Sequence, residues 1–369
     1  MRQTDIFLEL IRLGLWKEAE YKPFETQPNW KTILKIAKEQ SMIAIVFDGI
    51  KKISKSFMPQ TRELLQWYAL VVCIENSNEQ HDKDLCSLTA YCQSKKIDNR
   101  LMKGQGCASF YPQPNHRQCG DIDLFVGEEQ YNIAKHAIIQ ANITIEKEGI
   151  CDAHFLWGET QVELHKIEVF FYDKSLNRKL QEFFRKEEWL ETYVIEIGNQ
   201  QIQLFNPTFN VFYTFIHLYH HFLQVGIGLR QICDWMLMMK SLEEKIDWDR
   251  LHEYLKSIES LRAWKTFYGL TVVYLGQNLD NVPVWMAEYS KDDVQFVLKD
   301  IMCVGNFGKY GNSFQKRSFN GGLLANVSSF MSLIKRLITV SRFGYKEAIA
   351  YPLWKLFNDK TLLNRYKNN

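Results

Sequence analysis

The sequence predicts an α+β protein in which a small mixed sheet lies between two helical regions. Three observations carry this prediction. Apolar residues recur at helical spacing over residues 1–95, strand patterns follow over residues 96–206, and helical spacing returns over residues 207–369. These ranges are the expected domains: an N-terminal helical region, an α/β core and a C-terminal helical region. Of the 369 residues, 46% are hydrophobic and 24% are charged, which excludes wholesale disorder.

The first region predicts a succession of amphipathic helices. Its apolar residues fall three or four positions apart, as Ile6, Leu10 and Leu13 do in the opening segment. Asp5 and Glu9 interrupt that segment with charge, so it predicts a helix and not a signal peptide. No stretch of the chain approaches the ~20 apolar residues of a membrane span. Eight cysteines without CxxC spacing predict a reduced protein, and the expected location is the cytoplasm.

The middle region predicts a mixed sheet. Residues 121–126, DIDLFV, are rich in branched and aromatic side chains and predict a strand, and residues 128–142 predict a helix. Two antiparallel hairpins follow, the first turning at Gly158–Glu159 and the second at Gly198–Asn199. The strands of the first hairpin and the helix between the hairpins are expected over residues 153–157, 160–170 and 175–191.

Helical periodicity resumes after Pro207, a residue that suits the first turn of a helix. Phe209, Phe212 and Ile216 share one face of this expected helix. Much later, apolar residues step by three or four positions over residues 323–337 and predict an amphipathic helix. The C-terminal region is therefore expected to be helical throughout.

Charge is distributed unevenly along the chain. The net charge is +2, but residues 301–369 carry 11 basic and two acidic side chains, a local net charge of +9. Two interpretations are open: this basic segment binds a polyanion such as nucleic acid, or its Lys and Arg residues form the solvated surface of a helical region. Aromatic residues, on which bases can stack, are interleaved with the cations. These residues are Lys335, Arg336, Arg342, Phe343, Tyr345, Lys346, Tyr351, Trp354, Lys355, Phe357 and Arg365.

Asp121 and Asp123 are the most informative side chains of the sequence. In a strand they point to one face, while Ile122 and Leu124 point to the other. Two neighbouring carboxylates repel each other unless a cation lies between them, and such oxygen ligands suit Mg²⁺ bound to a substrate phosphate. The alternative is that the pair only caps an exposed strand end with solvated charges.

The surroundings of the two aspartates favour phosphate chemistry. Lys103-Gly104 begins a glycine-containing loop whose backbone N–H groups can approach an anion, and Arg117 offers a bidentate phosphate contact. Glu163 and His165 share a face of the later strand, and pairing that strand beside the first would bring Glu163 near the aspartates. Three carboxylates can hold two metal ions about 3.5–4 Å apart. In the alternative interpretation, Lys103 is a solvated strand-end charge and His165 a core histidine.

A histidine pair and an arginine follow in the C-terminal region. His217 and His221 are four residues apart on one helical face, which is metal-ligand spacing, but Leu218 stands where a zinc protease needs glutamate. Structural hydrogen bonding, contact with nucleotide or substrate, and a metal site all stay open for this pair. Arg230 and Asp234 are also four apart, so they form an intrahelical ion pair or contact the substrate.

These residues together resemble a known family. Lys103-Gly104, the Tyr-Pro-x-Pro segment at 111–114, Arg117 and Gly120-Asp121-Ile122-Asp123-Leu124 resemble the nucleotidyltransferases of the DNA polymerase beta-like superfamily. The bacterial "uncharacterised nucleotidyltransferase" family is the most similar, and the abortive-infection toxin-type nucleotidyltransferases are more distant. Residues 162–165, Val-Glu-Leu-His, resemble the later carboxylate strand of the family, and residues 217–234 resemble its helical second half. The resemblance covers residues 98–240.

The resemblance implies a small mixed-sheet nucleotidyltransferase core and a Mg²⁺-dependent enzyme. Such an enzyme transfers a nucleoside monophosphate from an NTP, for example ATP, to a hydroxyl of an acceptor, which here is a sugar, a small molecule, a protein hydroxyl or RNA. Two Mg²⁺ ions are expected, and Mn²⁺ is an alternative. The implied catalytic and metal-binding residues are Asp121, Asp123 and Glu163; those for the nucleotide are Lys103, Gly104, Arg117 and His165; His217, His221 and Arg230 are the possible substrate contacts.

The chain departs from the superfamily pattern at one position. The superfamily usually carries Gly-Ser about a dozen residues before its aspartates, whereas this chain has Lys103-Gly104 and a longer gap to Asp121. Lys103 would then supply charge where a serine hydroxyl otherwise binds phosphate. Two alternatives follow from this departure and from the family: a catalytically degenerate module that binds a nucleotide or a partner, and a toxin-like nucleotidyltransferase that acts on RNA.

Overall fold

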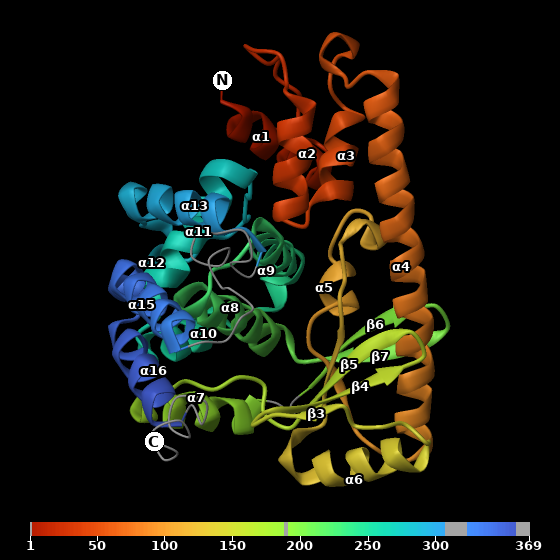
Figure 1. Cartoon of the computed structure of the whole chain (residues 1–369), viewed down its shortest axis with the longest axis vertical. Helices are drawn as coiled ribbons and strands as arrows, with labels where there is room; N and C mark the ends of the chain where they lie inside the picture. Colours follow the sequence, from red (N-terminus) through yellow and green to blue (C-terminus); the bar gives the residue numbers. More distant parts are fainter. Residues whose placement is uncertain (1, 188–190, 307–322, 359–369) are drawn as a thin grey trace.

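The computed structural model describes residues 2–187, 191–306 and 323–358, and it confirms the mixed α+β fold (Figure 1). Helices α1 (Gln3–Leu15), α2 (Trp30–Glu39) and α3 (Ile43–Ile50) form a bundle at one end of the molecule. Gly14 and Gly49 let α1 and α3 cross closely, because a Cβ on Gly14 would lie 2.1 Å from the carbonyl oxygen of Ile45 and one on Gly49 2.0 Å from that of Leu10.

Helix α4 (Thr61–Ser94) links the helical bundle to the sheet. Its 34 residues span about 50 Å along one side of the molecule. Its N-terminal half packs against α3, while Leu85, Leu88 and Cys92 in its C-terminal half belong to the hydrophobic core of the sheet. The helix therefore fixes the position of the sheet relative to the N-terminal bundle.

The main sheet has five strands in the order β1-β2-β5-β4-β3. Strand β2 is parallel to β5, and the other neighbours are antiparallel. Helix α6 (Gly127–Gln140) and α4 cover one face, towards which Ile122 and Leu124 point, so the predicted alternation of side chains is confirmed. The strands are β1 (Arg100–Leu101), β2 (Ile122–Phe125), β3 (Lys147–Glu148), β4 (Asp152–Trp157) and β5 (Thr160–His165).

Both predicted hairpins are present. Strands β4 and β5 turn at Gly158–Glu159, although β5 ends at His165 because the backbone bends over residues 166–168, where the predicted strand continued to residue 170. After α7 (Lys174–Glu187), strands β6 (Tyr193–Ile197) and β7 (Gln200–Leu204) form the second hairpin with its turn at Gly198–Asn199. Strand β7 also contacts β1 and α4, which attaches this hairpin to the main sheet.

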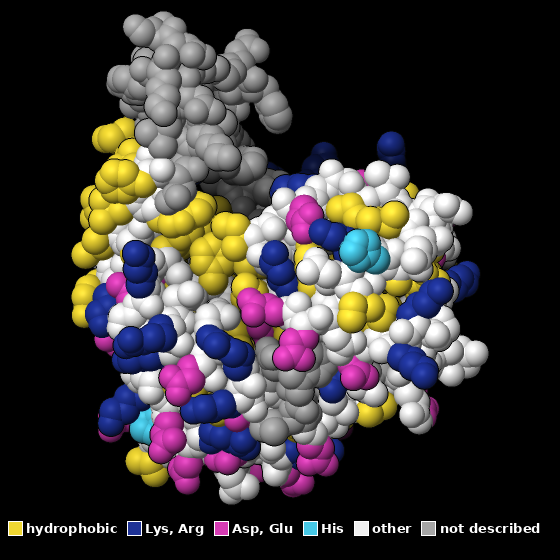
Figure 2. Space-filling model, turned by 90° about the horizontal axis from the view of Figure 1, so that it is seen from below, with side chains coloured by type: hydrophobic (Ala, Val, Ile, Leu, Met, Phe, Trp, Pro, Cys, Tyr) yellow, Lys and Arg dark blue, Asp and Glu magenta, His cyan; other side chains and the backbone are white. Residues whose placement is uncertain are grey.

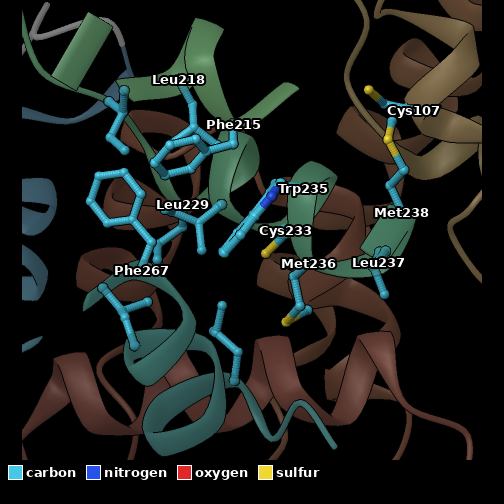
Figure 3. Close-up of a cluster of buried hydrophobic side chains, with 14 of the residues drawn as sticks. Cys107, Phe215, Leu218, Leu229, Cys233, Trp235, Met236, Leu237, Met238 and Phe267 are labelled. Atoms are coloured by element: carbon cyan, nitrogen blue, oxygen red, sulfur yellow. The ribbon is translucent and has the colours of Figure 1, made fainter. Parts of the chain in front are cut away.

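The helices after the second hairpin surround a second hydrophobic core. Pro207 begins α8, and the side chain of Asn206 caps it by accepting a 3.0 Å hydrogen bond from the backbone N–H of Phe209. Phe215 and Leu218 of α8, Trp235 of α9 and Phe267 of α11 converge in this core (Figure 3). The helices are α8 (Pro207–Gln224), α9 (Leu229–Leu242), α10 (Trp248–Ser257), α11 (Leu261–Leu275), α12 (Val284–Ala287), α13 (Lys291–Val304), α15 (Leu323–Val340) and α16 (Tyr345–Asn358).

The N-terminal bundle shares this second core. Helix α1 packs on α11, and the indole N–H of Trp16 donates a 2.6 Å hydrogen bond to the backbone oxygen of Leu275. The boundaries at residues 95 and 206 stay predictions, since α4 contributes to both cores. The helix predicted over residues 323–337 is present as α15, although the side chains of residues 323–329 lie outside the description. Among the described residues, no helix combines the length and apolar character needed to cross a membrane.

Candidate active site

A cavity of about 680 Å³ lies where the polar face of the sheet meets helices α8 and α9. Small-molecule sites have volumes in this range, about 300–1,000 Å³. Nine of the ten residues singled out from the sequence line it, although they come from segments more than 120 residues apart. They are Lys103, Gly104, Arg117, Asp121, Asp123, Glu163, His217, His221 and Arg230; His165 lies just beneath them, 5% exposed.

Asp123 and Glu163 occupy directly opposed positions on the parallel strands β2 and β5. Both side chains point away from the hydrophobic core, because their neighbours in the strands, such as Leu124 and Leu164, fill it. The structure thus brings Glu163 beside Asp123, as expected from the sequence. Asp121 lies one residue before β2 and on the same side, facing the cavity.

Cationic side chains already surround Asp123. The Lys103 ammonium lies 2.8 Å from its Oδ1, and His165 Nε2 lies 3.2 Å from the same oxygen and 3.4 Å from Glu163 Oε2. With Asp123 only 2% exposed, these contacts neutralise a carboxylate that is hidden from water. Lys103 therefore contacts a carboxylate here, and is not the solvated strand-end charge of the alternative interpretation.

This arrangement separates the pKa values of the acidic groups. Burial opposes ionisation of Asp123, but Lys103 and His165 outweigh it and lower its pKa. Hydrogen bonding to His165 lowers the pKa of Glu163, whereas the negative charge of Asp123, together with burial, raises the pKa of Asp121. Burial lowers the pKa of His165, yet the two carboxylates raise it overall to about 9. The imidazole of His165 is thus an imidazolium between two carboxylates at neutral pH.

The Lys103-Gly104 loop is held against the start of β2. Gly104 has φ of 54°, and a Cβ there would lie 3.1 Å from the backbone oxygen of Asp121. Only glycine adopts this conformation readily, and the close contact keeps the loop beside the aspartates. Gly104 thereby sets the position from which Lys103 reaches Asp123.

We expect Gly104→Ala to lower the free energy of unfolding by about 1–3 kcal/mol, because the side chain forces a strained positive φ and a close contact. Gly120→Ala is the matched control, since Gly120 lines the same cavity and has no atom within 4 Å of the added Cβ. Urea unfolding of both variants checks this expectation. Equal losses in the two variants would contradict it.

The α8 histidines form a neutral pair next to Lys103. His217 Nε2 lies 3.0 Å from Lys103 Nζ and accepts a hydrogen bond from this ammonium, and His221 Nε2 lies 3.2 Å from the same nitrogen. Burial, with the nearby positive charges, lowers the pKa of His217 well below its usual value and that of His221 to about 3. The pair serves hydrogen bonding and faces the cavity, which leaves contact with substrate open.

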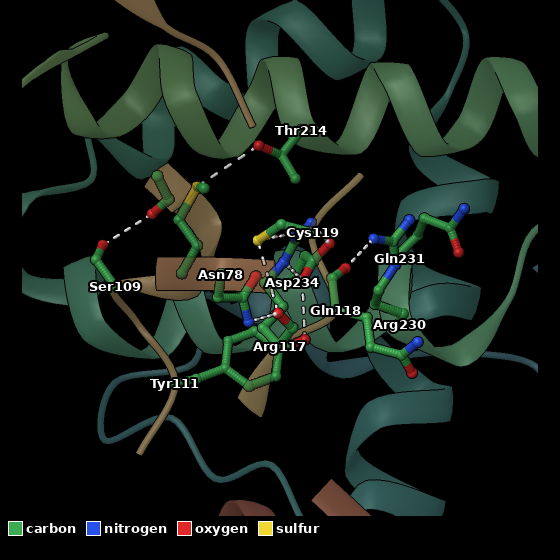
Figure 4. A network of polar contacts seen from close by, with 12 residues as sticks. Asn78, Ser109, Tyr111, Arg117, Gln118, Cys119, Thr214, Arg230, Gln231 and Asp234 are labelled. Carbon is green, nitrogen blue, oxygen red and sulfur yellow. Dashed lines mark hydrogen bonds and ion pairs between the residues drawn. The ribbon is translucent and has the colours of Figure 1, made fainter. Parts of the chain in front are cut away.

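Arg117 and Asp234 form a buried ion pair across the cavity wall (Figure 4). The Arg117 Nε and Nη2 atoms donate to the two Asp234 carboxylate oxygens at 2.7 and 2.8 Å, and the Tyr111 hydroxyl donates to Oδ1 at 2.8 Å. The sequence suggested a phosphate contact for Arg117 and a pairing of Asp234 with Arg230. In the structure, Arg117 joins the loop before β2 to α9 through Asp234, and its phosphate contact stays a prediction.

Arg230 is left facing the cavity. It donates a hydrogen bond to the backbone oxygen of Gln118 (Figure 4), and its charge acts on Asp121. Asp234 is engaged by Arg117, and the Arg230 side chain lines the cavity. This assignment required tertiary structure, since spacing alone favoured an intrahelical pair.

His154 and Asp152 of β4 complete the polar face and were missed in the sequence. His154 Nδ1 lies 3.5 Å from Glu163 Oε1, and its Nε2 lies 3.1 Å from Asp152 Oδ1. The signal was present, because a two-residue turn at Gly158–Glu159 places residue 154 opposite residue 163 and residue 152 opposite residue 165. His154 and Glu163 therefore face the cavity together.

The family of the chain follows from a match over residues 26–276, which contain every residue of the cavity lining except Asn306. The chain belongs to the uncharacterised nucleotidyltransferase family. The structure of an antigenic nucleotidyltransferase-like protein from Paracoccidioides brasiliensis is similar at 16% identity and a TM-score of 0.35, over 55% of this chain and 95% of that one. A search of curated proteins finds no significant match. The family membership agrees with the resemblance noted in the sequence.

The donor atoms that face this cavity fit a divalent cation. Among the described residues, ligand atoms of Asp123, Glu163 and His165 lie within 4.8 Å of one another, and those of Asp152, His154 and Glu163 form a second such group. Carboxylate oxygens suit Mg²⁺ and Mn²⁺, and imidazole suits transition metals. Asp121 belongs to neither group, although it faces the same cavity. An ion here would compete with the Lys103 ammonium for Asp123.

Deprotonation of the His165 imidazolium makes the metal-free protein less stable at alkaline pH. The folded pKa of His165, about 9, exceeds the unfolded value of about 6.5. Its contribution to the free energy of unfolding is therefore complete below about pH 6.5 and is lost as the pH rises through 9. The pKa difference corresponds to about 3 kcal/mol. In EDTA, the free energy of unfolding of the wild type minus that of His165→Gln should therefore fall between pH 6.5 and 9.

Chemical unfolding at several pH values measures that difference. Taking the difference removes contributions that both proteins share, such as that of His116, whose pKa is also raised because Asp48 and Glu75 outweigh its burial. A pH-independent difference between the two proteins would show that His165 is not ionised between the carboxylates.

Proposed function

We propose that the protein is a Mg²⁺-dependent nucleotidyltransferase that moves a nucleoside monophosphate from an NTP to a hydroxyl group. One observation carries the proposal: the β2–β5 register places Asp123 beside Glu163 on the wall of the cavity, in a chain of the nucleotidyltransferase family. The eight cysteines are all unpaired, which supports a reducing compartment such as the cytoplasm.

In the proposed site, Asp121, Asp123 and Glu163 hold the metal, with His165 orienting the two innermost carboxylates. Two Mg²⁺ ions, or Mn²⁺, would supply Lewis-acid neutralisation of the triphosphate and of the attacking oxygen. The structure suits such a charge arrangement, since these carboxylates lie on one rigid sheet face and on the wall of a single cavity.

Lys103 and Arg230 are the cations assigned to the triphosphate. Lys103 moves from Asp123 to a phosphate oxygen in this proposal, and Arg230 offers a planar guanidinium from α9. Gly104 keeps the loop close to Asp121, and Arg117 positions the wall through Asp234. Pyrophosphate leaves as the acceptor oxygen bonds to the α-phosphorus.

The acceptor hydroxyl is assigned to the α8 side of the cavity. His217 and His221 are neutral there and accept or donate hydrogen bonds without adding charge. Glu163, whose pKa is lowered, is ionised at neutral pH and can take the hydroxyl proton. A sugar, another small molecule, a protein hydroxyl and an RNA end all present such a group.

In the test, the protein is incubated with α-³²P-labelled NTPs and either Mg²⁺ or Mn²⁺. Three acceptor pools are added in separate reactions: total RNA, protein extract and small-molecule extract. We expect label to enter one pool, and the pool identifies the acceptor class; label in RNA would support a toxin-like enzyme. Asp123→Asn should remove the incorporation, and no incorporation in any pool would contradict the proposed activity.

One observation favours a second candidate, a module that binds a nucleotide without turnover. The Lys103 ammonium lies 2.8 Å from Asp123, where a metal ion would bind. Calorimetry with ATP and the other NTPs separates the candidates. NTP binding that tightens with Mg²⁺ and is lost in Asp123→Asn supports the enzyme, and binding indifferent to Mg²⁺ supports the module.

A further inference from the structure

Helices α15 and α16 expose an apolar surface beyond the part of the chain that matches the family, residues 26–276. The two helices contact each other, and Figure 2 shows hydrophobic side chains gathered on the flank where they lie. The exposed fractions of Ile338 and Phe357 are 71% and 73%. The other members of this surface, here called the α15–α16 surface, are Met331, Tyr345, Ile349, Leu353 and Leu356.

The spacing of these residues makes one continuous face on each helix. Tyr345, Ile349 and Leu353 follow one another at intervals of four along α16, and Met331 and Ile338 are seven apart on α15. Side chains of this kind gain about 25 cal/mol for each Å² of apolar surface removed from water. Contiguous apolar surface of this type indicates a binding surface.

The charge on these helices restricts the partner. Among residues 323–358, Glu347 is the only acidic residue, and it is 3% exposed. Residues 323–358 therefore contribute apolar and cationic groups and no exposed carboxylate, and the Glu259 carboxylate, 39% exposed, neutralises Lys346. A partner that is apolar and anionic at once complements it, which describes the interface of a bilayer with anionic phospholipids.

The same cations argue against nucleic acid. Three of the five Lys and Arg residues among residues 323–358 are engaged in ion pairs within the chain: Arg336 with Asp300, Arg342 with Asp293 and Lys346 with Glu259. Lys335 and Lys355 are the remaining two. Nucleic-acid affinity depends on neutralising several phosphates, and the exposed side chains are mostly aliphatic, with little ability to stack on bases.

We propose that the α15–α16 surface binds the face of an anionic phospholipid membrane. The apolar side chains enter the boundary between headgroups and acyl chains, and Lys335 and Lys355 contact the lipid phosphates. The helices lie on the bilayer, in keeping with the absence of a spanning helix among the described residues. This binding would place the cavity of the site at a membrane, independently of the reaction it performs.

Co-sedimentation with vesicles tests the proposal on the full-length protein. We compare vesicles of phosphatidylcholine alone with vesicles containing 30% phosphatidylglycerol, a probe composition within the range that recruits basic interfacial helices. The wild type should partition to the anionic vesicles, and the Ile349→Ser/Leu353→Ser/Phe357→Ser variant should lose about tenfold or more in partition coefficient. Lys335→Gln/Lys355→Gln should lose affinity only for the anionic vesicles.

The matched control is Ile133→Ser/Val284→Ser, which removes two apolar side chains of α6 and α12 that are 59% and 90% exposed. This variant should bind as the wild type does. No binding by the wild type, or equal binding by the triple variant, overturns the proposal. Sedimentation velocity supplies the other decisive outcome: a wild-type dimer that the triple variant dissociates, without vesicle binding, assigns the surface to a second copy of the chain and also overturns it.

Discussion

Replacing Asp123 by Asn is expected to lower the rate of nucleotidyl transfer by about 10³-fold, or about 4 kcal/mol of transition-state stabilisation. The carboxylate is nearly isosteric with the amide, but it is the side chain that contacts Lys103 and His165 and lies opposite Glu163. Removing its charge weakens the metal site, takes away the carboxylate that Lys103 contacts and leaves His165 with Glu163 alone. Single-turnover transfer of label to the acceptor identified in the pool experiment measures the loss.

The matched control for this variant is Asp84→Asn. Asp84 is a buried carboxylate of α4 that accepts hydrogen bonds from Thr160 Oγ1 at 2.8 Å and Glu159 N at 3.0 Å, at the turn of the same β4–β5 hairpin, and it does not line the cavity. Asp84→Asn should lower the free energy of unfolding and leave the transfer rate of the folded protein within a few-fold of the wild-type rate. Asp123→Asn activity above about a tenth of wild type would exclude Asp123 as a metal ligand.

A second readout keeps this result separate from misfolding. Electron paramagnetic resonance of Mn²⁺ titrated into each protein counts bound ions without any substrate. Asp123→Asn and Glu163→Gln should bind Mn²⁺ at least tenfold more weakly than Asp84→Asn, because only the first two remove donors at the cavity. Equal affinities in all three would place the metal elsewhere.

The part of the site that the sequence predicted depends on local periodicity. Alternation along a strand fixes the face of Asp121 and Asp123, and the two-residue turn at Gly158–Glu159 fixes the β4–β5 register. What periodicity leaves open is which strand lies next to β2. The sequence indicated only that Glu163 would lie near the aspartates if its strand paired beside the first; the structure has that pairing, and it is parallel.

The partners of the charged residues were not predictable in this way. Arg117 and Asp234 are 117 residues apart, and their pairing depends on how α9 packs against the loop before β2. Sequence spacing suggested Arg230 as the partner of Asp234. The position of Arg117 shortly before the two aspartates suggested a contact with phosphate. A buried charge that is not hydrated needs a partner of opposite charge. The packing of the helices therefore determines which cation pairs with which anion.

The basic C-terminal segment illustrates the same limit. Its net charge of +9 suggested a polyanion partner, but Arg336, Arg342 and Lys346 are paired with acidic residues of α13 and of the turn between α10 and α11. Acidic side chains from the first 300 residues thus form ion pairs that hold the C-terminal helices in place. Arg365 lies outside the described residues.

Breaking the Arg117–Asp234 pair is expected to have the largest effect on stability. Both side chains are buried, at 4% and 7% exposure, so Arg117→Met leaves the Asp234 carboxylate with the Tyr111 hydroxyl as its only side-chain hydrogen-bond donor among the described residues. Removing one partner of a buried ion pair costs about 3–5 kcal/mol, since the remaining charge stays hidden from water. Urea unfolding monitored by tryptophan fluorescence should show a lower midpoint urea concentration, with an unchanged slope of the unfolding free energy against urea concentration.

The double variant Arg117→Met/Asp234→Leu distinguishes an ion pair from general packing. Because it leaves no uncompensated buried charge, it should recover most of the loss, whereas two independent packing defects would add. The exposed pair Lys186–Glu182, at 64% and 60% exposure, is the comparison: Lys186→Met should cost less than about 1 kcal/mol. If Arg117→Met costs no more than Lys186→Met, the loop before β2 does not depend on α9 for its position, and Arg117 is then free for the phosphate contact that its sequence position first suggested.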